Sequence, residues 1–337
     1  MRFLIIGGTG LISTPMTRFL LEKGEDVTLF NRGQRKARFP EGAKVILGDR
    51  THFADFEHQM VEAGTFDFVI DMVCFRPEEA ESAVRAFKGR IDQYIFCSTV
   101  DVYGKPGLNM PYKESEPRLA LTEYGKNKAL CEDIFTEAHN KGNFKTTIIR
   151  PAATYGEGGT IIHTFGWKTT YIDRIRKGKP IIVSGDGNSL WVMCHVDDCA
   201  RAFLAACGNS KAYGKAYHAT GEEWMTWNQF HQKVAQAFNA PEPKLIHIPA
   251  DILFCLAPEQ AAITYYNFQY SNVYDNTAAK QDLGFAYTIP FVEGARRTVT
   301  WLDQNNSIEN SDMDPFDDRL ISTWERMTDA LTDELKK

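Results

Sequence analysis

The feature that most constrains the fold is a glycine-rich turn directly after the first apolar run. Residues 3–6 are apolar, Gly7-Gly8-Thr9-Gly10 follows at once, and a helical period begins near Pro15. Glycines allow a tight reversal and a close approach of backbone N–H groups to a phosphate, and the N-terminus of the next helix adds partial positive charge. An ordinary turn is the alternative. The context favours phosphate binding by a set of four residues, Gly7, Gly10, Leu11 and Ile12.

The first half of the chain repeats one rhythm, in which a β-branched or aromatic run is followed by a turn and a helical period. The strand-like runs are 3–6, 27–30, 44–47, 68–70, 93–96 and 146–149, and the helix-like segments are 15–23, 54–63, 77–87 and 124–139. This alternation implies parallel strands joined by right-handed crossovers. The runs show little polar alternation, as expected for a sheet covered on both faces. We predict an α/β, Rossmann-like doubly wound parallel sheet.

After Pro151 the rhythm loosens, which indicates a smaller C-terminal lobe. A short strand is expected at 181–183, and helices at 197–206, 226–238 and 290–301. The tail carries apolar residues at the spacing of an amphipathic helix, namely Ile321, Trp324 and Leu331. We predict three parts: a Rossmann domain at 1–165 to which 190–209 returns, a substrate-binding lobe at 166–310, and a helical tail at 311–337.

Composition limits the classes of function. The 337 residues include 38 basic and 44 acidic side chains, which give a formal net charge of -6, and 43% are hydrophobic. The apolar fraction argues against disorder, and the excess of acid argues against a protein that coats nucleic acid or an anionic membrane. No stretch approaches the ~20 apolar residues of a membrane span. We expect a soluble protein with no membrane partner and no nucleic acid partner.

The cysteines indicate a reducing compartment. The seven cysteines are scattered singly, without a CxxC pair, and their total is odd. This pattern disfavours a disulfide framework and a zinc site of the usual spacing. Most lie in apolar runs, such as Cys97 in 94–97, where a thiol behaves as a small buried hydrophobe. We expect reduced core cysteines, no metal, and a cytoplasmic location.

The end of the second strand-like run decides which dinucleotide would fit. An acid at this place accepts hydrogen bonds from the adenosine ribose and selects the cofactor without a 2′-phosphate. This chain has Asn31 and Arg32 instead, followed by three further cations, Arg35, Lys36 and Arg38. Arg32 could hold a 2′-phosphate by a bidentate contact, which modestly favours NADP over NAD. A solvated run of charge explains these residues nearly as well.

Asp49 follows the third strand-like run, in Gly48-Asp49-Arg50. A carboxylate at this place can accept a hydrogen bond from the amino group of an adenine. An acid in a surface turn explains Asp49 equally well on sequence alone. We keep Asp49 as a candidate cofactor-binding residue.

Tyr124 and Lys128 stand four residues apart where a predicted helix begins, so they share one face of it. A nearby ammonium favours the phenolate and lowers the pKa of a tyrosine, as acid or base chemistry near neutral pH requires. Thr99, at the end of the fifth strand-like run, could donate a hydrogen bond to a substrate oxygen. An exposed Tyr/Lys pair would be the better interpretation if these residues stood alone.

Thr99, Tyr124 and Lys128 occur within an ordered set of motifs. The set is Gly7-Gly8-Thr9-Gly10, Ser98-Thr99, Val102-Tyr103-Gly104, Tyr124-x-x-x-Lys128, Arg150-Pro151, Tyr155-Gly156, Gly185-Asp186-Gly187 and His195-Val196-Asp197-Asp198. Over residues 1 to about 302 it resembles the extended short-chain dehydrogenases/reductases, the NAD-dependent epimerase/dehydratase family. The resemblance implies a bound nicotinamide cofactor, Tyr124 as catalytic base with Thr99 and Lys128 beside it, and a homodimer formed through helices of the Rossmann lobe.

In this family the base removes a hydroxyl proton while hydride passes to the nicotinamide. Epimerases return the hydride to the other face, and dehydratases use the ketone to eliminate water. We therefore predict an oxidoreductase of the epimerase/dehydratase type that acts on a secondary hydroxyl of a sugar or sugar-like substrate. The alternatives are a simple NAD(P)-dependent dehydrogenase or reductase, and a non-catalytic RNA- or partner-binding member, because the chain also looks similar to family members related to chloroplast stem-loop RNA-binding proteins.

Asp101 is a further catalytic candidate. It lies near the place where sugar-nucleotide dehydratases of the family carry a catalytic acid pair, but the residue before it is Val100. An additional acid or base role for Asp101 is one hypothesis. A carboxylate that caps the turn is an equally good one.

Trp191 marks a departure from the nucleotide-sugar enzymes. These enzymes commonly place an arginine four residues before the position of His195, to hold a diphosphate, and this chain has Trp191 there. A nucleotide-diphosphate substrate is therefore not implied. Trp191 could bind a sugar by stacking, together with Phe165, Trp167 and Tyr171. Aromatic residues in such a lobe more often form the core.

Overall fold

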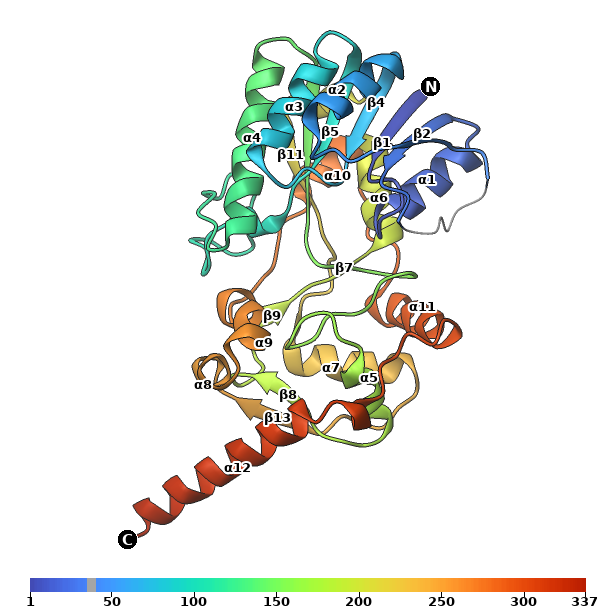
Figure 1. The fold of residues 1–337 in the computed structure, drawn as a ribbon. Helices are drawn as coiled ribbons and strands as arrows, with labels where there is room; N and C mark the ends of the chain where they lie inside the picture. Colours follow the sequence, from blue (N-terminus) through green and yellow to red (C-terminus); the bar gives the residue numbers. More distant parts are fainter. Residues whose placement is uncertain (35–40) are drawn as a thin grey trace. The chain divides into compact units, whose positions relative to one another are not determined.

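The computed structural model describes residues 1–34 and 41–337, so three cations of the basic run, Arg35, Lys36 and Arg38, lie outside the described residues. The chain divides into two compact units (Figure 1). Unit 1 contains residues 1–154, 193–222 and 274–289, and unit 2 contains 155–192, 223–273 and 290–337. The predicted domain boundaries stay a prediction. Residues 274–289, which that prediction places in the smaller lobe, lie in unit 1.

Unit 1 is built on a seven-stranded parallel sheet. Its strands are β1 (Arg2–Ile6), β2 (Asp26–Asn31), β3 (Lys44–Leu47), β4 (Phe66–Asp71), β5 (Ile91–Cys97), β6 (Lys145–Pro151) and β11 (Lys215–Ala219). Their order in space is β11-β6-β5-β4-β1-β2-β3, and each neighbouring pair runs parallel. The order changes direction between β1 and β4, which is where doubly wound sheets bind ligands. The predicted Rossmann-like fold is confirmed.

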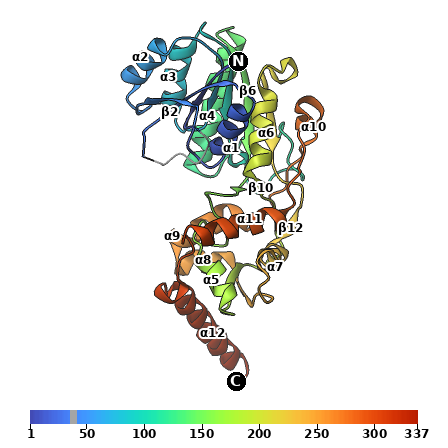
Figure 2. The ribbon, with the colours of Figure 1, turned by 90° about the vertical axis from the view of Figure 1, so that its right-hand side faces the viewer.

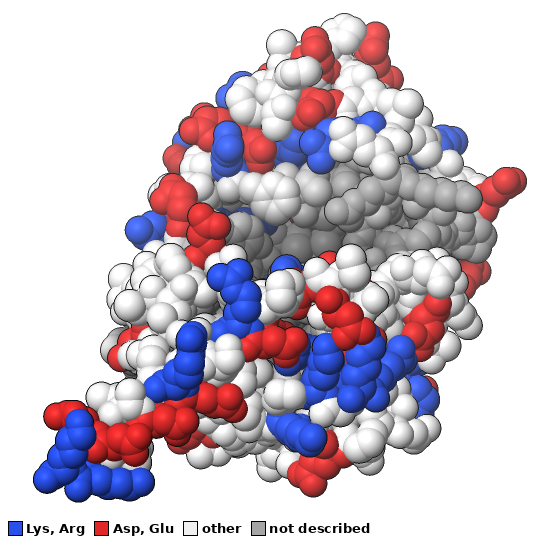
Figure 3. Space-filling view, turned by 60° about the horizontal axis from the view of Figure 1, so that its bottom comes forward, with Lys and Arg blue, Asp and Glu red and all other residues white. Residues whose placement is uncertain are grey.

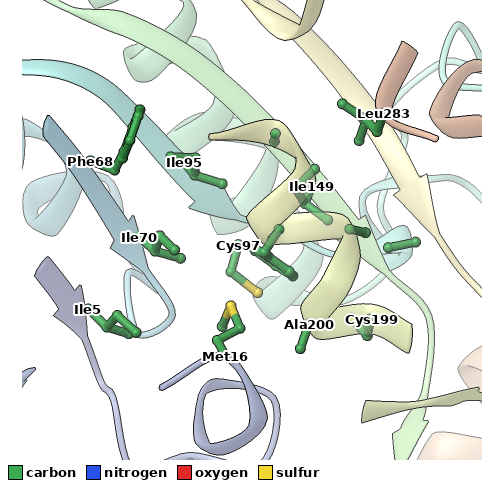
Figure 4. Close-up of a cluster of buried hydrophobic side chains, with 14 of the residues drawn as sticks. Ile5, Met16, Phe68, Ile70, Ile95, Cys97, Ile149, Cys199, Ala200 and Leu283 are labelled. Atoms are coloured by element: carbon green, nitrogen blue, oxygen red, sulfur yellow. The ribbon is translucent and has the colours of Figure 1, made fainter. Parts of the chain in front are cut away.

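Helices cover both faces of this sheet. One face packs against α1 (Ser13–Glu22), α6 (Val196–Ala206) and α10 (Thr277–Leu283). Figure 2 shows α1 beside α6, and Figure 4 shows Ile5, Ile70 and Ile95 of the sheet pointing toward Met16 of α1 and Cys199 and Ala200 of α6. The other face packs against α2 (Phe53–Glu62), α3 (Pro77–Phe87) and α4 (Glu123–Asn140). Residues alternate along each strand between the two cores, as strand geometry requires.

Unit 2 is mostly helical, with two small sheets. The sheets pair β8 (Ile181–Ser184) with β13 (Leu245–Ile248) in parallel and β9 (Leu190–Trp191) with β12 (Met225–Thr226) in antiparallel fashion. The helices are α5 (Thr170–Arg176), α7 (Trp227–Ala237), α8 (Ala250–Leu256), α9 (Pro258–Ile263), α11 (Phe291–Gln304) and α12 (Phe316–Leu335), with a π-helical turn, η3 (Thr264–Phe268).

The remaining elements are short. They are the two-residue strands β7 (Thr154–Tyr155) and β10 (Cys194–His195) and the 3₁₀ turns η1 (Val100–Val102), η2 (Ser210–Ala212) and η4 (Ser311–Met313). The predicted tail helix is α12, whose first turns bury Leu320 and Ile321 while Leu331 and Leu335 are exposed. In the part of the chain that the structure describes, none of the helices is long and apolar enough to cross a membrane.

Charges of both signs share the surface. On the face in Figure 3, Lys and Arg side chains lie among Asp and Glu side chains rather than apart from them. In unit 2, Lys168 pairs with Asp314 at 2.8 Å, and Lys177 pairs with Asp312 at 2.7 Å. On the face shown, this mixing of charges differs from the large basic surface that a nucleic acid backbone requires.

Candidate functional site

The turn between β1 and α1 requires glycine at two positions. Gly7 has a φ of 86°, and a Cβ there would lie 2.6 Å from Val73 Cγ1. A Cβ on Gly8 would lie 2.5 Å from Leu29 Cδ2. Real side chains do not tolerate such contacts, so the packing of β2 and of the loop after β4 accounts for both glycines. Gly8 was not among the predicted binding residues, and its requirement depends on a neighbouring strand.

Ser13 closes this turn. Its hydroxyl donates a hydrogen bond to the Gly7 carbonyl at 2.6 Å and accepts one from the Gly10 N–H at 2.8 Å. The helix α1 begins at Ser13 with Ile12 as its N-cap, and no side-chain cap is found there among the described residues. Leu11 and Ile12 therefore lie at a helix N-terminus, where backbone N–H groups and the helix dipole favour an anion. The turn fits a phosphate.

A cavity of about 490 Å³ adjoins the turn. It is lined by residues at the end of β2 and in the segments that follow β1, β2, β3 and β4, and its volume lies in the range of small-molecule sites. The predicted residues Gly7, Gly10, Asn31, Arg32 and Asp49 all belong to the lining. So do ten residues that were not predicted as binding residues, among them Arg50, Val73, Phe75 and Glu79.

Asn31, Arg32 and Asp49 shape one end of the cavity. Asn31 Oδ1 accepts a hydrogen bond from the Gly33 N–H at 2.9 Å, and the Arg32 side chain is exposed. The Asp49 carboxylate accepts hydrogen bonds from the backbone N–H and the hydroxyl of Thr51, at 2.9 and 2.8 Å. These two bonds, and the Arg32 cation, hold the pKa of Asp49 below its ordinary value. Asp49 therefore forms a turn and also faces the cavity as an anion.

A buried ion pair supports the cavity. The Arg50 guanidinium donates to Asp71 Oδ2 at 2.5 Å and to the Glu79 carbonyl at 2.8 Å. The Tyr94 hydroxyl donates to the same Asp71 oxygen at 2.5 Å, and burial, followed by the carboxylate, raises the pKa of that phenol. Asp71 is fully buried and Arg50 nearly so. Loss of either partner would leave an uncompensated buried charge, which is strongly destabilising.

Tyr124 and Thr99 are brought together by a contact between two main-chain segments. Tyr124 lies in the first turn of α4, next to Gly125, where a Cβ would lie 2.1 Å from the Asp101 carbonyl oxygen of η1. This close approach packs the start of α4 against η1, the turn that Thr99 caps, and the Thr99 side chain acts to lower the pKa of Tyr124. Thr99 also accepts a hydrogen bond from the Asp101 N–H at 3.1 Å, so its own hydroxyl is free to donate to the phenol oxygen.

Lys128 does not have the predicted effect on Tyr124. Lys128 is 1% exposed, and its ammonium donates to the carbonyls of Cys74 and Cys97 at 2.8 and 2.5 Å. The pKa of Tyr124 is raised, mainly by burial of its hydroxyl and then by Cys97 and Asp101, although the bond from Thr99 lowers it. The expected lowering of this pKa is therefore not found in this structure, in which Lys128 binds main-chain carbonyls.

Asp101 holds a buried cation. Its carboxylate accepts a hydrogen bond from the Lys105 ammonium at 3.4 Å, and only 4% of the Lys105 side chain is exposed. Burial lowers the pKa of Lys105, and the Asp101 carboxylate opposes this effect. In the turn itself it is the Thr99 side chain that caps the Asp101 N–H. The catalytic role of Asp101 stays a prediction.

Other motif residues hold the ends of β5 and β6 against α4. Arg150 at the end of β6 makes two hydrogen bonds to the Glu132 carboxylate of α4, at 2.8 and 2.6 Å, and a third to the Tyr103 hydroxyl at 2.7 Å. Ser98 donates to Glu132 at 2.5 Å, and the Tyr103 hydroxyl lies 2.6 Å from His218 Nε2. This buried network fixes the end of β5, where Thr99 follows, against α4.

Trp191 packs inside unit 2. It is 4% exposed, its ring stacks on Trp227 with centroids 5.0 Å apart, and Phe268 meets it edge to face at 4.7 Å. Tyr171 is likewise buried and stacks on His163 at 4.6 Å, whereas Trp167 is 49% exposed. Trp191 and Tyr171 are thus packed as core residues, the alternative interpretation of the aromatic set. Substrate binding by Trp191 stays a prediction.

The described residues, 1–34 and 41–337, include all seven cysteines. All seven are free thiols, and five of them are buried. Burial raises the pKa of Cys97 to about 11, so this thiol stays protonated next to Ser98. No group of three or more His, Cys, Asp or Glu side chains in this part of the chain is arranged to hold a metal ion.

The sequence is similar to those of several known proteins. A model of the "NAD dependent epimerase/dehydratase family" matches residues 3–219. The chloroplast stem-loop binding protein of 41 kDa b from Arabidopsis thaliana is 31% identical over 73% of this chain and 65% of its own length, just under two thirds. The 2′-dehydrokanamycin reductase of Streptomyces kanamyceticus is 27% identical over 72% of this chain and 68% of its own length.

A solved structure shows the same fold. The UDP-glucuronic acid 4-epimerase of Bacillus cereus, in complex with UDP-glucuronic acid and NAD, superposes with a TM-score of 0.73 at 17% identity. The match covers 90% of this chain and all of that chain. The matched part is longer than either unit alone, so the match includes residues of both units.

Proposed function

Because this chain belongs to the NAD-dependent epimerase/dehydratase family, we propose that it is an NAD(P)-dependent oxidoreductase acting on a secondary hydroxyl of a sugar or sugar-like substrate. One observation carries the proposal. Tyr124 lies at the start of α4, where Gly125 meets the Asp101 carbonyl of the turn that Thr99 caps, in the same unit as a glycine-lined cavity. The most favoured reaction is epimerisation, in which oxidation of the hydroxyl is a transient step.

We propose that the cavity beside the glycine turn binds a nicotinamide dinucleotide. In this proposal the backbone N–H groups of Leu11 and Ile12 hold the pyrophosphate, and Asp49 accepts a hydrogen bond from the adenine amino group. Arg32 binds a 2′-phosphate, which modestly favours NADP, since Asn31 stands where an acid would select NAD. NAD stays open as the cofactor, and the Bacillus cereus neighbour contains NAD. When bound, the cofactor supplies a hydride acceptor.

In the proposed reaction, Tyr124 and Thr99 act on the same substrate hydroxyl in different ways. Tyr124, as phenolate, removes the proton from the substrate hydroxyl, and Thr99 donates a hydrogen bond to the same oxygen. The raised pKa of Tyr124 means that the phenolate must be favoured by positive charge during the reaction. In this proposal Lys128, whose ammonium donates to the carbonyls of Cys74 and Cys97, supplies that charge. Asp101 serves as a further acid or base.

The substrate is assigned by class only. We propose that unit 2 binds it, with Trp191 as a contact residue, and that the substrate need not carry a nucleotide diphosphate, since Trp191 stands where an arginine would hold one. We propose further that the protein is cytoplasmic and works as a homodimer formed through helices of unit 1, including α4. The free thiols and the exposed Leu130 of α4 are consistent with these two assignments.

Two other functions have specific support. A simple reductase is favoured by the similarity to 2′-dehydrokanamycin reductase and would show net consumption of reduced cofactor. A role in binding RNA or a partner is favoured by the similarity to a stem-loop binding protein. The formal charge of -6 and the pairing of basic side chains with acids count against RNA binding, which filter binding over a salt series would test.

Replacing the base tests the proposal. Tyr124→Phe removes the proton acceptor and leaves the glycine turn intact, so turnover should fall by about 10²- to 10⁴-fold while cofactor binding is retained. Tyr266→Phe is the matched control, because Tyr266 is a similarly exposed tyrosine outside the site. Undiminished activity of Tyr124→Phe would rule out the assignment. Mass spectrometry of small molecules released from the protein would identify NAD or NADP and any retained substrate, which supplies the assay.

A further inference from the structure

Two segments of unit 2 carry opposite charge and lie against each other. Residues 168–179, around α5, contain five cations, which we call the cationic face: Lys168, Arg174, Arg176, Lys177 and Lys179. Residues 303–318, from the last turn of α11 to the first turn of α12, contain six acids and neither lysine nor arginine, and we call them the acidic segment. Contacts between these two segments account for most of the charge on both.

The three lysines of the cationic face bind two aspartates of the acidic segment. Lys168 donates a hydrogen bond to Asp314 at 2.8 Å. Lys177 and Lys179 donate to the two carboxylate oxygens of Asp312, at 2.7 and 2.6 Å. Hydrogen bonds from Lys177 and then Lys179 lower the pKa of Asp312 to about 2. The carboxylate is therefore charged at neutral pH, and its two oxygens are each taken by one ammonium.

The two arginines of the cationic face bind the two ends of the acidic segment. Arg176 donates two hydrogen bonds to the Asp303 carboxylate, at 2.7 and 2.8 Å, and the buried Arg174 donates to Asp318 at 2.6 Å. Apart from Arg174, the side chains paired across this contact are 30% to 52% exposed. Exposed ion pairs each contribute little to stability, so a contact made of them can open while the core of unit 2 stays folded.

The residues around the cationic face also contact the main chain and one aromatic ring of the acidic segment. The Thr169 hydroxyl accepts a hydrogen bond from a main-chain N–H of the segment at 2.9 Å, and the Asp173 carboxylate accepts one from the Ser311 N–H at 2.7 Å. The Phe165 ring meets the Phe316 ring edge to face, with centroids 5.2 Å apart. A phosphate backbone has no N–H group to offer Asp173, whose charge would repel it. These contacts therefore favour an acidic peptide over a nucleic acid.

From these contacts we propose that the cationic face is a docking surface for an acidic peptide segment of a partner protein, and that the acidic segment of this chain occupies it in cis. A segment of the same chain acts at an effective concentration in the millimolar range, so it excludes a partner that binds weakly. A partner segment that displaces it replaces its ion pairs, and the charge of the face stays matched. This inference goes beyond the proposed function, because it requires neither cofactor nor substrate.

A fluorescein-labelled peptide with the sequence of residues 303–318 tests this surface on the intact protein. Asp312→Asn together with Asp314→Asn removes three ion pairs of the cis contact and leaves the cationic face unchanged. The peptide should therefore bind this double variant with a Kd at least about 10-fold lower than its Kd for wild-type protein. The affinity should fall when the salt concentration rises from about 50 to about 500 mM. Fluorescence anisotropy gives each Kd.

Three further variants show where the peptide binds. Asp329→Asn together with Asp333→Asn is the matched control, because it changes the net charge equally at exposed positions of α12 outside the contact, and its Kd should equal that of wild-type protein. Lys177→Gln together with Lys179→Gln, added to the first double variant, should abolish the gain in affinity. If thermal unfolding shows that the first double variant folds poorly, Asp314→Asn alone, which removes one ion pair, should give a smaller gain.

Each outcome decides the inference. An equal Kd for wild-type protein and the first double variant would overturn it, and so would an equal gain in the matched control, since net charge alone would then explain the binding. A single-stranded RNA of equal charge that binds as tightly as the peptide would overturn it too, because the face would then bind any polyanion. A gain in the first double variant alone, lost when the two lysines are replaced, supports the docking surface. Failure here leaves the proposed function untouched, since cofactor binding and turnover are measured separately.

Discussion

The two units use aromatic side chains in opposite ways. In unit 1, Phe75 stands exposed on a fixed loop at the wall of a cavity, beside a turn formed by main chain. In unit 2, Trp191 and Trp227 are buried and stack on each other. The difference teaches that cofactor chemistry can be inferred from motifs, because backbone geometry dictates those residues. The choice of substrate cannot be inferred in this way, because Trp191, the proposed substrate contact, is packed against Trp227 and Phe268 in this structure.

The largest test of this comparison is Trp191→Ala. If Trp191 is a core residue, its removal leaves a cavity beside Trp227 and should lower the free energy of unfolding by about 3 to 5 kcal/mol. Trp224→Ala, at a tryptophan that is 46% exposed in the same unit, should change it by no more than about 0.5 kcal/mol. Urea unfolding measures both. Equal small effects would mean that Trp191 is not packed as described.

An intermediate effect is expected at the glycine turn. Gly7→Ala introduces a Cβ 2.6 Å from Val73 at a positive φ, so it should cost about 1 to 3 kcal/mol for overpacking, in addition to about 1 kcal/mol for the left-handed backbone. Gly24 also has a positive φ, of 73°, but a Cβ there meets no atom within 4 Å. Gly24→Ala should therefore lower the free energy of unfolding only by the cost of the left-handed backbone, about 1 kcal/mol. Thermal unfolding compares the two. Similar melting temperatures would show that the loop after β4 gives way.

The smallest effect concerns acid stability. Burial lowers the pKa of His163 to about 3 and that of His231 to about 4, both in unit 2, and lowers the pKa of His218 in unit 1 to about 4. Neutral imidazoles of this kind stabilise the fold fully above about pH 6.5, and this contribution is lost as the pH falls toward 4. Asp317 has the opposite effect on stability. Burial raises its pKa to about 6, so its protonation favours the folded protein as the pH falls from about 6 toward 4.

His163→Asn measures this contribution. Between about pH 7 and pH 5.5 it should reduce the acid-induced loss of unfolding free energy by about 1 kcal/mol, because one proton fewer is taken up on unfolding. Urea unfolding at the two pH values gives the difference, which cancels the constant cost of the altered packing. An unchanged difference would mean that His163 can be protonated within the folded protein.

The first six strands of the sheet and the helices α1 to α4 were predictable because each carries a local pattern, as β1 and α1 do around the glycine turn. The strand β11 was not predicted, since its five residues include Lys215 and His218 and it is stabilised by pairing with the distant β6. Two contacts of the site were also missed, the ion pair of Arg50 with Asp71 and the carbonyl ligands of Lys128. Both depend on strand ends meeting in space, and no spacing in the sequence encodes that.

The contact at Gly125 has a consequence for anyone who would evolve this protein toward new substrates. A side chain there would collide with the Asp101 carbonyl oxygen, so the residue between Tyr124 and Lys128 is as constrained as the two it separates. Random libraries that vary position 125 would displace the helix that carries Tyr124 and Lys128. Searches of other genomes for this pair should accordingly ask for Tyr-Gly-x-x-Lys, a stricter signature than two side chains alone.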